Sequence, residues 1–113
     1  MTEPRLAGSV LVSALLRRAE AEGGFGTVLA KGDSTAGAVA VILLEKGANP
    51  RFLERLLQPD GSYSWRESGQ VIENERELKT FLERRQKFDP DVWILELDIA
   101  SAERFAAEMN SFS

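Results

Sequence analysis

The segment Lys31–Gly37 carries the residue types that phosphate-cradling loops use, namely glycines, hydroxyls and a lysine, in the order Lys-Gly-Asp-Ser-Thr-Ala-Gly. A Walker A loop needs Gly-Lys-Ser/Thr leading directly into a helix, whereas an apolar run typical of a strand follows here, so no helix dipole would face a phosphate. The simpler interpretation is a strand-joining turn, in which glycines supply positive φ and Asp33 bonds its own backbone. The residues favour the turn and leave an anion-binding loop as the alternative.

Two pairs of adjacent arginines, Arg17-Arg18 and Arg84-Arg85, supply guanidinium forks that suit carboxylate or phosphate groups. If the two pairs converged, they would form an anion site. Acidic residues lie close to both pairs in the sequence, at Glu20, Glu22, Glu83 and Asp89. The sequence therefore favours internal ion pairing.

Arg85 is the strongest candidate among these arginines. It follows Leu78 by seven residues and so falls on the apolar face of a predicted helix. We expect its side chain to be partly buried and paired, and Asp89, four residues on, is a natural partner.

The sequence contains no cysteine and no histidine. Their absence excludes disulfides, thiolate zinc sites and the Ser-His-Asp and Cys-His triads. Carboxylate, lysine or tyrosine chemistry, or magnesium held by oxygen ligands, remains open. Carboxylates are plentiful, at Glu67, Glu73, Glu75, Glu77, Glu96 and Asp98, but their spacing specifies neither a catalytic pair nor a ligand set. We expect no metal and no cofactor.

The two tryptophans, Trp65 and Trp93, lie in segments of strand type, where aromatic side chains usually bury surface without binding a ligand. An exposed surface of Tyr63, Trp65 and Arg66 would suit single-stranded nucleic acid, but further interleaved aromatics are missing. Packing is therefore the favoured role for both tryptophans.

The elements that must position these residues follow from hydrophobic periodicity and turn signals. We expect strands over 25–31, 37–45, 62–66 and 91–98. We expect a first helix over 9–22 capped by Ser9, and a second helix after the cap Asn74 with an apolar stripe of Leu78, Phe81, Leu82 and Phe88. A third helix should begin at Ser101 and carry Phe105, Met109 and Phe112 on its apolar face. The apolar run 38–44 suits a central strand buried on both faces.

Residues 51–58 fit two patterns. Asn49-Pro50 could start a short helix with an apolar side, and periodicity alone slightly favours that helix. Pro59-Asp60-Gly61, however, is a strong turn signal that would join 51–58 to the strand after it as a hairpin. We predict the strand.

These elements give the order α-β-β-β-β-α-β-α in one domain, 1–113. Helices and hairpins interspersed in this way predict an α+β fold, a mainly antiparallel sheet of about five strands with three helices packed on it.

Composition narrows the class of protein. Apolar residues make up 43% of the chain and charged residues 28%, which is typical of a globular domain. The net charge of −4 argues against nucleic acid and anionic membranes as partners. The apolar run 38–44 is too short to cross a bilayer, and Arg17-Arg18 stand where a signal peptide would have small residues, so we expect a cytoplasmic protein.

Three segments together resemble an uncharacterised family of small bacterial proteins, domain of unknown function 1491. They are Ser13–Arg18 with Gly23-Gly24-Phe25, then Lys31–Gly37, then Arg85–Trp93 with its Asp89-Pro90. The resemblance spans nearly the whole chain, although Leu11-Val12 stand where members of the family tend to carry a tryptophan. It implies a strand over 51–57 and transfers no activity, cofactor or partner.

The family-like segments also define the candidate binding residues, which are Arg17, Arg18, Lys31, Gly32, Asp33, Gly37, Arg85, Asp89 and Trp93. Our leading hypothesis is a non-enzymatic binding or adaptor module that engages a protein partner or a small anionic ligand, as a monomer or homodimer. The alternative is an enzyme acting on a phosphorylated or nucleotide-like substrate, with Lys31 or Asp33 as polar catalyst and Arg85 as phosphate clamp.

Overall fold

The apolar run predicted as a central strand forms β2 (Val39–Glu45), whose residues from Val39 to Leu43 are all buried. In the computed structural model, which describes residues 8–34, 38–68 and 72–109, β2 lies in the middle of a sheet with strand order β1-β5-β2-β3-β4. The other strands are β1 (Phe25–Ala30), β3 (Ala48–Leu57), β4 (Tyr63–Glu67) and β5 (Trp93–Ile99).

The sheet is mainly antiparallel, as predicted. Within the described ranges only β2 and β5 pair in parallel, with Val39 opposite Trp93, and the three other neighbouring pairs are antiparallel. The order α-β-β-β-β-α-β-α is also confirmed. The parallel pair arises because the chain leaves the sheet between β4 and β5 to form a helix.

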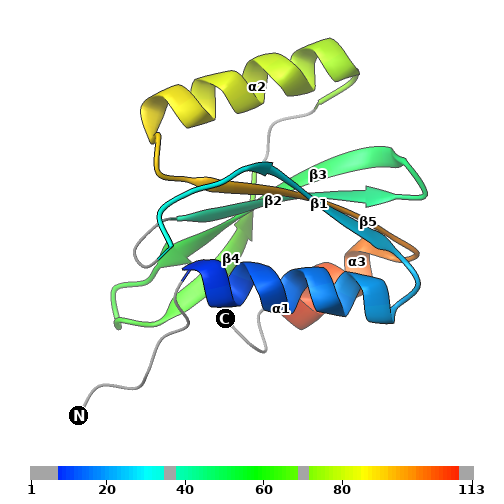
Figure 1. Cartoon of the computed structure of the whole chain (residues 1–113), viewed down its shortest axis with the longest axis horizontal. Coiled ribbons are helices and arrows are strands. Elements are labelled where there is room, and N and C mark those ends of the chain that lie inside the picture. The colour runs from blue at the N-terminus through cyan, green and yellow to red at the C-terminus, as the bar shows by residue number, and fades with distance from the viewer. Residues whose placement is uncertain (1–7, 35–37, 69–71, 110–113) are drawn as a thin grey trace.

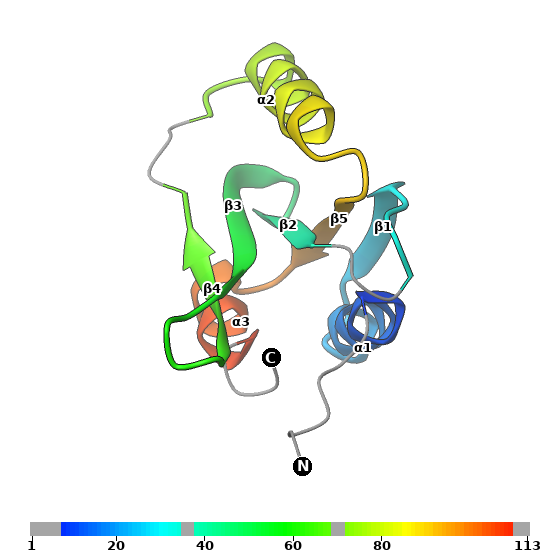
Figure 2. The same ribbon diagram turned by 90° about the vertical axis from the view of Figure 1, so that its left-hand side faces the viewer.

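Helices cover both faces of the sheet. Figure 1 shows α1 (Gly8–Ala21) and α3 (Ala102–Met109) on one face and α2 (Glu75–Phe88) alone on the other, and the turned view in Figure 2 shows the same layers. None of the helices in the described part of the chain is long and apolar enough to cross a membrane.

The larger core lies between the sheet and the pair α1 and α3. Leu11, Leu15 and Phe105 pack there against Trp93 and Leu95. Both tryptophans are buried, with 6% of Trp65 and 6% of Trp93 exposed, which agrees with the packing role predicted for them. The smaller core lies beneath α2 and contains Ile42, Phe52 and Ile94.

Residues 51–57 lie within β3, so the strand that the turn signal and the family resemblance predicted is confirmed, and Gln58 follows its end. The turn before β3 is tight, because only Lys46 and Gly47, with φ of 52° and 78°, connect Glu45 to Ala48. Asn49 and Pro50, the possible start of a short helix, lie instead within β3.

Two predictions about the helices, the cap of α1 and the place of Phe88, were wrong. Ser9, predicted as a cap, lies inside α1, which already includes Gly8. Asn74 does cap α2, since its side chain accepts a hydrogen bond from the Glu77 amide at 2.9 Å. Phe88, predicted on the apolar stripe of α2, is 87% exposed because ten residues after Leu78 the helix has turned it away from the sheet. Phe112 lies outside the described residues.

Candidate functional site

The loop after β1 is held against the start of β5 by its backbone. The Asp33 amide donates to the Asp91 carbonyl at 3.0 Å, and the Trp93 indole donates to the Asp33 carbonyl at 2.7 Å. Gly32 is packed so closely there that a Cβ atom would overlap the Asp91 carbonyl oxygen. Gly32, Asp33 and Trp93 are thus brought together where the loop after β1 packs against the start of β5.

Asp89 belongs to the same end of the sheet. Its carboxylate accepts the Asp91 amide at 3.1 Å and its carbonyl accepts the Val92 amide at 3.2 Å, which forms the turn from α2 into β5. The Ser9 amide in turn donates to the Ser34 carbonyl at 3.1 Å and ties α1 to the loop. Lys31 is exposed beside this joint, and the candidate Gly37 lies outside the described residues.

The two arginine pairs do not converge, because α1 and α2 lie on opposite faces of the sheet (Figure 2). Arg18 bridges α1 and α3 through Glu108 at 2.8 Å and also pairs with Glu22 at 3.2 Å. These carboxylates raise the pKa of the Arg18 guanidinium. Arg17 and Arg84 are exposed.

Arg85 is 84% buried by side chain, as its place on the apolar face predicted, but its main partner is Glu54 of β3. Glu54 accepts two hydrogen bonds at 2.9 and 2.6 Å, whereas the predicted partner Asp89 is 3.9 Å away. The bidentate contact raises the pKa of the Arg85 guanidinium. Sequence reasoning missed Glu54 because the two residues are 31 positions apart.

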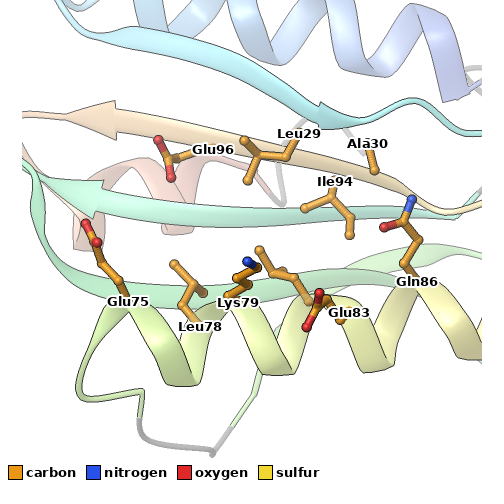
Figure 3. A pocket seen from close by; sticks show the side chains of 10 residues that line it. Leu29, Ala30, Glu75, Leu78, Lys79, Glu83, Gln86, Ile94 and Glu96 are labelled. Carbon is orange, nitrogen blue, oxygen red and sulfur yellow. The ribbon is translucent and has the colours of Figure 1, made fainter.

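An open groove lies between α2 and the strands β1 and β5. Figure 3 shows side chains from both sides pointing into it. We call it the α2 groove; its apolar lining is Leu29, Ala30, Leu78, Leu82 and Ile94, and its polar lining is Glu75, Lys79, Glu83, Gln86 and Glu96. Its volume is about 400 Å³, within the range of small-molecule binding pockets.

The α2 groove exists because α2 is incompletely packed. No residue of α2 is fully buried, although α1, of the same length of 14 residues, buries Leu11, Leu15 and Ala19 among others. Phe81 contacts Phe52 edge to face, with 4.6 Å between the ring centroids. The Arg85–Glu54 ion pair attaches the end of the helix to β3. Leu82, between these two contacts, and Leu78, one turn before Phe81, stay half-exposed.

A second hollow of about 330 Å³ continues the α2 groove beneath the start of the helix, toward the turn between β2 and β3. The two share Glu75, Leu78 and Glu96, and Glu73 lines the second hollow only. Carboxylates therefore outnumber the single ammonium group of Lys79 along the combined lining. An anion would meet repulsion here, whereas a cationic group would be attracted.

β1 contributes Leu29 to the groove lining, and this side chain is 45% exposed. Phe25 and Val28 of the same strand, 73% and 41% exposed, lie outside the lining. Sequence reasoning identified the stripe of α2 but missed this site, since a periodic stripe predicts which face of a helix is apolar and not how completely the sheet covers it. No group of three or more metal-ligating residue types gathers within the described ranges.

Comparison with known proteins places the chain in a family. The model for a protein of unknown function, DUF1491, matches residues 6–107. The crystal structure of a DUF1491 family protein from Caulobacter crescentus CB15 is similar, with a TM-score of 0.78, 33% identity, and coverage of 89% of this chain and 94% of that one.

A solution structure of a protein from A. tumefaciens is also similar, with a TM-score of 0.74 and 27% identity over 90% of this chain and 92% of that one. No curated protein matched the sequence. The family model and the solved structures agree with the resemblance carried by the three sequence segments, and the chain belongs to the DUF1491 family, whose function is unknown.

Proposed function

We propose that the chain is a non-catalytic binding module that takes a protein segment in the α2 groove. The observation that carries this proposal is the incomplete burial of α2, because Leu78 and Leu82 cover the smaller core only partly and also line the open groove. An amphipathic helix gains stability by covering its stripe, so a partner that fills the α2 groove would supply the missing contacts.

A protein partner suits the groove better than a small anion does. Its polar lining is mainly carboxylate, and the arginines proposed to hold an anion lie on opposite faces of the sheet. Arg85, the proposed phosphate clamp, already donates two hydrogen bonds from its guanidinium group to the Glu54 carboxylate. An enzyme acting on a phosphorylated substrate would lack this clamp.

The family-like residues have a supporting role in this proposal. Gly32, Asp33 and Trp93 fix the loop after β1 to the start of β5, and Asp89 shapes the exit from α2. These contacts join the end of β1 and the end of α2 to the start of β5, and all three elements border the α2 groove.

The proposal is tested by selecting binders to the folded chain from a random peptide library displayed on phage and mapping the bound peptides by backbone-amide NMR. We expect shifts at Leu29, Leu78 and Leu82. Leu29→Asn should weaken binding, while the matched variant Leu57→Asn, at an exposed leucine of β3 outside the groove lining, should not. The proposal fails if no peptide is enriched, or if the shifts map elsewhere and Leu29→Asn binds normally.

A further inference from the structure

We propose that the segment bound in the α2 groove is an extended, basic peptide that adds a strand to the outer edge of β1. This inference rests on the proposed function and specifies the chemistry and conformation of the partner. Three features of the described residues carry it: the open edge of β1, the bulge at Leu29, and the charge of the groove.

The first feature is an unprotected sheet edge. Among the strands that the structure describes, β1 lies at the end of the strand order (Figure 2) and pairs with β5 alone, so its outer backbone groups have no partner in this sheet. Proteins usually protect such an edge with charged residues or proline, yet Phe25–Ala30 contains neither. The opposite edge strand, β4, does carry exposed charges at Arg66 and Glu67. β1 is therefore the edge suited to pairing with another chain.

The second feature joins this edge to the α2 groove. Val28 pairs with Leu95 and Ala30 pairs with Ile94, so Leu29 is an extra residue in the ladder. Leu29 lines the α2 groove beside Ile94 (Figure 3). A strand paired along Phe25–Val28 would place every second side chain on the α2 side of the sheet, next to Leu29.

The third feature is charge complementarity. The α2 groove is lined by Glu75, Glu83 and Glu96 against one cation, Lys79. The ion pairs found within the described residues use other carboxylates, at Glu22, Glu54, Glu67, Asp89 and Glu108. Lysine or arginine side chains of a bound strand would lay their aliphatic stems over the leucines and reach these carboxylates with their charged ends.

The test uses synthetic peptides in which lysine alternates with valine, titrated into isotope-labelled chain and followed by NMR. We expect shifts along Phe25–Leu29 and slowed hydrogen exchange of β1 amides. A peptide with glutamate in place of lysine, and a lysine peptide with alternate backbone amides methylated, should each bind at least about tenfold more weakly, equivalent to about 1.4 kcal/mol. Equal binding by the methylated peptide would overturn strand addition, and equal binding by the glutamate peptide would overturn the charge assignment.

A charge reversal supplies the second measurement. Glu83→Lys should weaken binding of the lysine peptide and improve binding of the glutamate peptide, while Glu20→Lys, the same change on exposed α1, should alter neither. If library peptides occupy the α2 groove but are not basic or leave β1 unshifted, this inference fails and the proposed function stands. If nothing binds the groove, both fail. A dimer that pairs β1 with β1 in ultracentrifugation and NMR would place a second copy at the edge and overturn the basic peptide.

Discussion

Gly32 lies against the backbone at the start of β5 so closely that no side chain fits there. A Cβ atom on Gly32 would overlap the Asp91 carbonyl oxygen and come within 2.7 Å of the Trp93 ring and of its amide nitrogen. Asp33, Asp91 and Trp93 also make the hydrogen bonds that join the loop after β1 to the start of β5. Compact backbone packing explains why a glycine stands at this point of the motif.

Gly32→Ala should lower the free energy of unfolding by about 1 to 3 kcal/mol, because the loop and the start of β5 must move apart to admit the methyl group. Urea unfolding followed by tryptophan fluorescence measures this change. Ser34→Ala, at an exposed position of the same loop, is the matched control and should change stability by less than about 0.5 kcal/mol. Equal stability of Gly32→Ala and the original chain would contradict the close packing of this loop.

The Arg85–Glu54 pair fixes α2 to β3 in a setting where water is scarce, with 16% and 21% of the two side chains exposed. Glu54→Leu should cost about 2 to 4 kcal/mol, because it leaves a largely buried guanidinium without its main partner. The double variant Glu54→Leu with Arg85→Met should recover much of the loss in thermal or urea unfolding. Additive losses in this double-mutant cycle would mean that the pair does not act as a unit.

At the scale of elements, β3 and β4 are joined beyond their ladder by Arg51 and Glu67. The guanidinium donates to the carboxylate at 3.0 and 2.6 Å and holds the pKa of Glu67 below its ordinary value. A carboxyl group whose pKa is lowered on folding stabilises the fold above its unfolded pKa, and this contribution disappears as the pH falls through the folded pKa. The hairpin should therefore lose stability in acid.

Glu67→Gln should remove part of this acid dependence. We expect the variant to be less stable near neutral pH by about 0.5 kcal/mol, since Glu67 is 41% exposed and solvent weakens the pair. The difference from the original chain should shrink between about pH 5 and pH 3, as the carboxyl group of the original chain becomes protonated. Urea unfolding across this pH range measures the difference in stability between the two chains. Glu20→Gln, at an exposed glutamate of α1, is the control. A constant difference at all pH values would contradict the ionic contribution.

At the scale of the whole molecule, the two faces of the sheet are unequally filled. α1 and α3 close a core that includes Leu11, Leu15 and Phe105, whereas α2 rests on Phe52 and Glu54 and buries none of its residues fully. The strands β2 and β5 lie between both layers, with buried residues along most of their length. Such a structure should open one layer at a time, because few apolar contacts resist the departure of α2.

Native-state hydrogen exchange should therefore rank β2 and β5 slowest and α2 faster than α1. The two helices have the same length, so their difference reports packing rather than helix length. We expect α2 to exchange at least about tenfold faster than α1, which corresponds to an opening free energy lower by about 1.4 kcal/mol. Equal protection of α1 and α2 would mean that the layer beneath α2 is closed in solution.

Much of this fold follows from local sequence. The apolar run 38–44 gave β2, Pro59-Asp60-Gly61 gave the hairpin of β3 and β4, and Asn74 gave the start of α2. These features depend on backbone propensity, side-chain periodicity and turn chemistry, each of which acts over a few neighbouring residues. For the same reason Arg85 was correctly predicted to be partly buried and paired.

Tertiary structure decided the features that join distant segments. Glu54 as the partner of Arg85, the hydrogen bond from Trp93 to Asp33, and the separation of the two arginine pairs all depend on which face of the sheet each helix covers. The opening of the α2 groove depends on how completely α2 covers the strands beneath it. Periodicity determines the direction in which a side chain points, whereas only the packed sheet determines what it meets there.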